Sequence, residues 1–171
     1  MTNTTIRRAD ASDAGTLAAL GAATFTDAFG RLYPPEDLAA FIASTHTTAK
    51  LAGELADPAM AHWLAKHGGE PVGYAVAGPC GLPHPDVTPA CGELKRIYVS
   101  RTRQGEGLGA RLLDEALAWL ERDGPRRLWI GVFSQNLGAQ RLYERHGFRK
   151  VGDYVFEVGA TRDPEFILRR G

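Results

Sequence analysis

Three glycines in the sequence GEGLG, residues 105–109, stand directly before a leucine-rich segment that predicts a helix. The first backbone N–H groups of a helix have no intrahelical acceptor, and the helix dipole adds a favourable field for an anion. Because glycine has no Cβ, Gly105, Gly107 and Gly109 would also let phosphate oxygens approach the backbone closely. The turn is therefore a candidate pyrophosphate site, and a tight turn without a ligand is the alternative interpretation.

Two familiar phosphate motifs do not fit this turn. A P-loop requires a lysine and a hydroxyl residue directly after its last glycine, whereas Ala110 and Arg111 stand there. The dinucleotide fingerprint belongs to an N-terminal βαβ unit, whereas these glycines come late in the chain, after a predicted hairpin. Arg101 and Arg103 flank the turn and are placed either to meet further phosphates or to remain in solvent.

Composition narrows the class of protein. The chain has 171 residues, 44% hydrophobic and 23% charged, which suits one globular domain over residues 1–171. Lysine plus arginine equals aspartate plus glutamate, at 20 each, so no net charge points to nucleic acid or an anionic membrane. No apolar run is long enough for a membrane span or a signal peptide, which predicts a cytoplasmic protein. Cys80 and Cys91 lack metal-ligand spacing, so we expect reduced thiols and no metal.

The hydrophobic pattern predicts alternating helices and strands. Asp10, Ser12 and Asp13 are candidate caps for the first helix. The other predicted elements are a strand over 5–8, helices over 33–44 and 45–58, a hairpin over 60–66 and 72–77, a strand over 93–100, a helix over 107–122, a strand over 127–133, a helix over 136–148, and last strands over 151–159 and 164–170. This order predicts an α/β (α+β) sandwich around a mixed sheet.

The strand over 93–100 carries an irregularity. Its strongly apolar residues Leu94 and Ile97 are three positions apart, which breaks the strict alternation of a strand. We therefore expect a bulge that turns this strand away from its neighbour. An open crevice at strand ends is where α/β proteins bind ligands.

Two stretches carry a family resemblance. The run RIYVSRTRQGEGLGARLLDEAL, followed by LWIGVFSQNLGAQRLYERHGFRKVG, resembles the two central motifs of the GNAT (Gcn5-related) N-acetyltransferases. The resemblance extends from Glu70 to Phe156. It implies the GNAT fold, a twisted mixed sheet of about six to seven strands with about four to five helices, in which splayed parallel strands form an acetyl-CoA cleft. It also implies acetyl-CoA as the acyl donor.

The resemblance assigns roles to particular residues. Gln104, Gly107 and Gly109 would occupy the turn that binds the acetyl-CoA pyrophosphate, with Gly105 and Leu108 between them. Ile97, Tyr98 and Val99 would lend backbone groups to the pantetheine arm. Asn136, with Ala139 beside it, would also bind this arm, and Tyr143 would lie near the thioester sulfur.

Acetyl transfer to an amine requires a neutral nucleophile, stabilisation of the oxyanion and a proton for the departing thiolate. Tyr143 is the candidate general acid; the alternative is a tyrosine that only packs its ring. Glu93 matches the glutamate that histone-acetylating relatives use as base, or is only a solvated charge. The backbone near Tyr98 and Val99 could polarise the thioester carbonyl. His84 and His146 are expected to be structural or surface residues.

Substrate selection is expected from the N-terminal helices and the loop over 78–92. The segment ATFTDAFGRLYPPEDLAAFI and the tail VFEVGATRDPEFILRR are similar to the bacterial GNAT branch that acetylates polyamines. Phe25, Phe29 and Tyr33 would then be either core residues or a substrate wall. The carboxylates available for a polyamine are Asp27, Glu36, Asp37, Glu93 and Glu157.

The expected partner is a small-molecule amine such as a polyamine, acetylated by direct attack in a ternary complex. Two other functions stay open: an acetyltransferase of protein N-termini or lysines, and a non-catalytic sensor of acyl-CoA or polyamine. Dimers are common in the family, so a homodimer is a further expectation from the resemblance.

Overall fold

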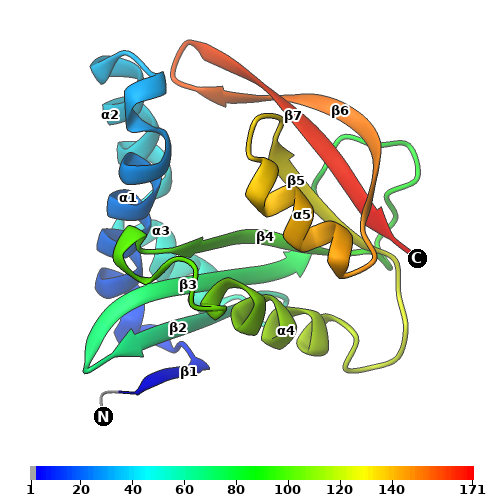
Figure 1. Ribbon diagram of the computed structural model, residues 1–171, viewed down its shortest axis with the longest axis horizontal. Coiled ribbons are helices and arrows are strands. Elements are labelled where there is room, and N and C mark those ends of the chain that lie inside the picture. Colours follow the sequence, from blue (N-terminus) through cyan, green and yellow to red (C-terminus); the bar gives the residue numbers. More distant parts are fainter. Residues whose placement is uncertain (1–2) are drawn as a thin grey trace.

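The computed structural model describes residues 3–171 and joins seven strands in one sheet (Figure 1). The strands are β1 (Thr4–Arg8), β2 (Ala61–His67), β3 (Glu70–Pro79), β4 (Gly92–Val99), β5 (Leu128–Phe133), β6 (Arg149–Val158) and β7 (Thr161–Arg170). The helices are α1 (Ala14–Phe29), α2 (Pro35–Thr45), α3 (Thr48–Ala56), α4 (Leu108–Leu120) and α5 (Leu137–Arg145). The sheet order is β1-β2-β3-β4-β5-β7-β6. Only β4 and β5 pair in parallel, which confirms the predicted mixed sheet.

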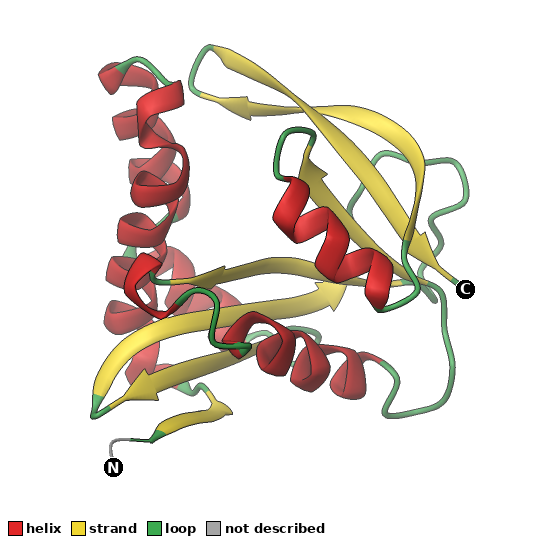
Figure 2. Ribbon diagram, in the orientation of Figure 1, coloured by secondary structure: helices red, strands yellow, loops and turns green. Residues whose placement is uncertain are grey.

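Helices cover both faces of the sheet (Figure 2). On β2, Trp63 packs into the core that contains the apolar stripe of α4, whereas the next residue, Leu64, packs with Leu17 of α1 and Leu51 of α3. This alternation is the period of two of a strand that is buried on both faces. The predicted stripe of α4 is buried as a whole: Leu108, Leu112, Leu113, Ala116, Leu117 and Leu120.

The expected bulge lies at Lys95. Val76 of β3 pairs with Arg96, but Ala77 pairs with Leu94, so Lys95 is the extra residue on β4. The insertion returns Leu94 and Ile97 to the same face, where both pack against the α4 side of the core. The odd spacing of these two residues in the sequence is thereby explained.

β4 and β5 separate soon after they meet. Their parallel pairing covers only Gly92 to Leu94 against Leu128 to Ile130. Beyond Leu94 no strand of residues 3–171 pairs with the β5 side of β4, whereas β5 stays paired with β7 along its other edge as far as Phe133. The sheet is therefore open between two strands that are neighbours at one end.

The hairpin of β6 and β7 reaches the N-terminal helices. Asp37 of α2 accepts hydrogen bonds from the Ala160 N–H at 3.1 Å and the Thr161 hydroxyl at 2.6 Å, in the turn between β6 and β7. The Tyr33 hydroxyl also donates to the Asp163 carboxylate of β7. Figure 1 shows this contact at the top of the molecule, where the tip of the hairpin meets α2.

Candidate functional site

A cavity of about 980 Å³ lies where β4 and β5 diverge. One side is formed by the glycine turn and α5, on the face that α4 covers. The opposite side is formed by α1, α2, the loop between β3 and β4, and the β6–β7 hairpin. The opening in the sheet therefore connects two chambers, called below the donor side and the acceptor side.

The glycine turn on the donor side has the form of an anion site. Gly105 and Gly107 have φ values of +82° and +78°, a region that other residues adopt at a cost. α4 starts after Gly107 without a side-chain cap, and its first backbone bond is from the Arg111 N–H to the Gly107 carbonyl at 3.1 Å. The N–H groups of residues 108–110 therefore have no intrahelical acceptor and remain available to a phosphate.

The open space around the turn agrees with a bound ligand. A Cβ on Gly105 or Gly107 would meet no atom within 4 Å, so no other part of the protein fills this side of the turn. Gly109, already helical, faces the cavity too, as does Ala110. Leu108 differs, because its side chain is buried in the core and only its backbone can contribute.

The side chains that flank the turn have other partners. The Gln104 side chain lines the cavity and donates to the Val99 carbonyl at 3.0 Å. Arg101 donates to the Asp27 carbonyl at 2.8 Å, and Arg103 pairs with Glu106 at 3.5 Å. Neither arginine lines the large cavity.

The remaining residues assigned to the donor side also line the cavity. Ile97, Tyr98 and Val99 line the cavity from the open edge of β4. The Asn136 Oδ1 caps α5 by accepting the Ala139 N–H at 3.2 Å. This capping bond leaves the side-chain NH₂ of Asn136 as the group that can donate to a ligand, whereas the N–H of Ala139 is already used.

Tyr143 projects from α5 into the gap and is 5% exposed. Its ring packs beside Phe148, with ring centroids 6.5 Å apart, so the packing interpretation and the cavity-facing interpretation both hold. Burial and the charge of Glu165 raise the pKa of Tyr143 above its ordinary value. The phenol therefore keeps its proton at neutral pH and has one to donate.

Glu93 lines the cavity but is already partnered. Its Oε1 accepts the Gly81 N–H at 3.0 Å and forms an ion pair with Lys95 Nζ at 3.2 Å. The carboxylate is therefore held in place by an ammonium group and a backbone N–H of the protein itself. These contacts favour a structural role for Glu93.

The acceptor side joins aromatic walls to carboxylates that the sequence reasoning missed. Phe25 and Tyr33 are buried in a cluster with Val158, and both also line the cavity. Of the five carboxylates named from the sequence, only Glu93 lines the large cavity; the other two carboxylates there are Asp163 and Glu165 of β7. Their spacing of two was a usable signal, because it predicts one shared face of a strand.

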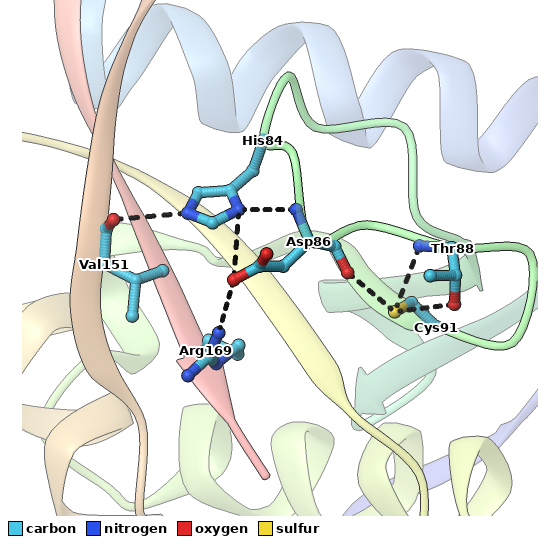
Figure 3. A network of polar contacts seen from close by, with 6 residues as sticks. All are labelled: His84, Asp86, Thr88, Cys91, Val151 and Arg169. Carbon is cyan, nitrogen blue, oxygen red and sulfur yellow. Dashed lines mark hydrogen bonds and ion pairs between the residues drawn. The ribbon is translucent and has the colours of Figure 1, made fainter.

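The loop between β3 and β4 contributes Gly81, Leu82 and Pro83 to the acceptor side. Figure 3 shows how the hairpin holds it: His84 Nε2 donates to the Val151 carbonyl at 3.3 Å, and Arg169 pairs with Asp86 at 3.2 Å. The tautomer of His84 fits, because its Nδ1 accepts the Asp86 N–H at 3.1 Å. This histidine is structural, as expected.

Three other groups bear on the expectations. His146 contacts the Leu142 carbonyl and Asp114 at the end of α5, outside the cavity. Cys80 and Cys91 are free thiols, and burial raises the pKa of Cys80 to about 11.

Within residues 3–171, no group of three or more histidine, cysteine or acidic side chains could hold a metal ion. None of the helices described has the length and apolarity needed to cross a bilayer.

Fold and cavity together define an α/β architecture in which a split sheet and an open glycine turn form a cleft suited to the phosphate-bearing donor of an acyltransferase. Residues 22–148 match the family model "Acetyltransferase (GNAT) family". An "Uncharacterized N-acetyltransferase" of Lactobacillus delbrueckii subsp. lactis is 31% identical over 170 residues, which cover 99% of this chain and 98% of the relative. The chain belongs to the GNAT acetyltransferase family, and its acyl donor is acetyl-CoA.

Two further comparisons concern a solved structure and a partial sequence match. The crystal structure of the PaiA N-acetyltransferase from Thermoplasma acidophilum in complex with coenzyme A has the same fold, with a TM-score of 0.78 and 18% identity over 98% of each chain. A "Probable spermine N(1)-acetyltransferase" of Bacillus subtilis subsp. natto is 34% identical over 64 residues, which cover 37% of this chain and 42% of that protein.

Proposed function

We propose that the protein acetylates a small primary amine, such as a polyamine, by direct attack of the amine on the thioester. The observation that carries this proposal is the acceptor side of the cavity, where Asp163 and Glu165 stand among aromatic walls. Carboxylates attract an ammonium group, and aromatic rings pack against its methylene chain and its charge. The partial likeness to a probable spermine acetyltransferase supports the same substrate class.

The contact between α2 and the β6–β7 hairpin favours a small molecule over a polypeptide. Asp37 binds the turn of the β6–β7 hairpin, and Tyr33 binds Asp163, so α2 and the hairpin are joined across this chamber. A peptide in extended form would require an open groove there.

Direct transfer is supported by the chemistry of the cavity lining. No cysteine belongs to the lining residues within the part of the chain that the structure describes. The raised pKa of Cys80, about 11, keeps that thiol protonated, so it is a poor nucleophile. We assign proton donation to the thiolate to Tyr143, and polarisation of the carbonyl to the open backbone edge near Tyr98 and Val99.

Thiol release from acetyl-CoA in the presence of an acceptor panel tests this proposal. The panel contains polyamines, monoamines, free amino acids and peptides with free N-termini and lysines. We expect turnover with polyamines or other small amines and little with peptides. Activity confined to peptides would indicate a protein acetyltransferase, and CoA binding without thiol release would indicate a sensor; either result contradicts the proposal.

A further inference from the structure

Charged groups around the acceptor side are mostly compensated. Lys95 forms an ion pair with Glu93. Arg96 of β4 forms an ion pair with Glu54 of α3 and contacts both of its carboxylate oxygens. His46 also lines the cavity, but burial lowers its pKa to about 4, so it is neutral. Within residues 3–171, no cation lies within ion-pair distance of Glu165.

Glu165 stands at the opening between the two chambers. It pairs across the sheet with Phe133, the last residue of β5, where β5 has already separated from β4. It is 9% exposed and lines the same cavity as Tyr143. The carboxylate therefore approaches the gap from the acceptor side, and the Tyr143 phenol approaches it from the donor side.

Glu165 is surrounded by phenols and by two further acids. The Tyr154 hydroxyl donates to Glu165 Oε1 at 3.3 Å. Burial raises the pKa of the four tyrosines that line the cavity, and the negative charge of Glu165 adds to this effect in each case: Tyr33, Tyr98, Tyr143 and Tyr154. The nearby acids are Asp163 on the same strand and Glu93, whose charge also acts on Tyr154.

We propose that Glu165 is the general base that takes the proton from the acceptor amine, a role that rests on the amine acetylation proposed above. Burial raises the pKa of Glu165 to about 7, with Asp163 raising it further and the Tyr154 hydrogen bond opposing them. A carboxylate with a pKa close to neutral pH is a far better proton acceptor than one with an ordinary value. Glu93, by contrast, is already engaged by an ion pair with Lys95 and by a hydrogen bond from the Gly81 N–H.

The protons balance as follows. The Glu165 carboxylate removes one proton from the ammonium group, and the nitrogen lone pair forms a bond to the thioester carbonyl carbon. The C–S bond then breaks, and the sulfur leaves with the bonding electrons. Tyr143 gives its proton to that sulfur and regains one from the nitrogen. Glu165 returns its proton to solvent, so ammonium and thioester become amide, thiol and one free proton.

Tyr154 is a positioning residue for this base. Gly131 of β5 leaves room for it, because a Cβ at Gly131 would lie 2.3 Å from the Tyr154 hydroxyl oxygen. The glycine thus permits the tyrosine to reach across the sheet and bind Glu165. Removing the Tyr154 hydroxyl takes away a hydrogen bond that stabilises the charged carboxylate, which raises the pKa of Glu165 further.

Kinetics with the best amine of the panel test the proposal. We expect wild-type kcat/KM to rise with pH around neutrality, and Glu165→Gln to lose this rise and about 10²–10⁴-fold of kcat/KM at pH 7. Only the rise due to deprotonation of the free amine, near pH ~10, should remain. Unchanged CoA affinity would show that the variant is folded, and Glu115→Gln, an exposed glutamate of α4, serves as the matched control with unchanged kinetics.

Tyr154→Phe provides the second variant. We expect its rising limb to shift to higher pH, an effect that a purely structural role would not produce. A Glu165→Gln variant that keeps the neutral limb, or a Tyr154→Phe limb that stays in place, would overturn the role of Glu165. A wild-type protein that turns over no amine would instead overturn the proposed function, so the two failures differ. A ¹³C NMR titration of the side-chain carboxyls needs no acceptor amine. A carboxyl signal that titrates near neutral pH in the wild type and is missing in Glu165→Gln would support the proposal. If no carboxyl signal titrates near neutral pH, the proposal is overturned.

Discussion

Replacing Gly107 by alanine tests whether the turn before α4 binds the diphosphate of CoA. Gly107 has a φ of +78°, and an L-residue in this region costs roughly 1–2 kcal/mol. A Cβ there meets no protein atom within 4 Å, so nothing in the fold holds an alanine in the strained conformation. We expect the free turn to relax, and the strain to be imposed again when the ligand binds.

That cost corresponds to a loss of CoA affinity of about 5- to 30-fold, since every 1.4 kcal/mol is about tenfold. Isothermal titration calorimetry with CoA measures it. Gly124→Ala is the matched control: Gly124 has a φ of +117°, its Cβ would also meet no atom within 4 Å, and it lies outside the cavity. This variant should bind CoA like the wild type. Unchanged affinity in Gly107→Ala, or an equal loss in both variants, would refute the assignment of the turn.

Three other changes have defined outcomes. Tyr143→Phe should lower kcat strongly in steady-state assays with little change in CoA affinity, and equal turnover across pH would exclude the acid role. Leu112→Ala, at a fully buried position of α4, should lower the free energy of unfolding by about 2–5 kcal/mol in urea denaturation. The Arg7 hydrogen bond lowers the pKa of Asp13 to about 2, below its unfolded value, so its stabilisation is present above pH ~4 and is lost as pH falls toward 2. Asp13→Asn should flatten the pH dependence of urea unfolding in this range, and an unchanged slope would exclude the linkage.

Local patterns were sufficient to predict much of the fold and to find the glycine turn that lines the cavity. Short stretches of sequence predict the stripe of α4 and the bulge between Leu94 and Ile97, and the structure confirms both. Asp10 caps the 3₁₀ turn Ala11–Asp13 that leads into α1, whereas Asp13, at the N-cap of α1, makes no side-chain cap bond. Element ends were less well predicted: α2 begins at Pro35 rather than residue 33, because Tyr33 is extended after the 3₁₀ turn Gly30–Leu32 and Pro34 is the N-cap of α2. The glycine turn was also readable, since its chemistry depends on backbone geometry within a few residues.

The acceptor side could not be read in the same way, because its chemistry arises from contacts between distant segments. Glu93 looks like a free carboxylate at a strand start, yet the Gly81 N–H of the preceding loop and Lys95 bind it. No local pattern in the sequence predicts the contact between Glu93 and Gly81.

Glu165 shows the converse case. In the sequence of the C-terminal tail, Glu165 looks like one acid among several. Its burial and its hydrogen bond depend on the pairing of β7 with β5 and on Tyr154 of β6, which reaches across Gly131. The sheet order that inserts β7 between β5 and β6 therefore determines which carboxylate is buried at the gap. We propose that backbone groups of α4 and β4 bind the donor and that the C-terminal hairpin supplies the acceptor chemistry, so substitutions in β6 and β7 should alter amine selection while CoA binding is retained.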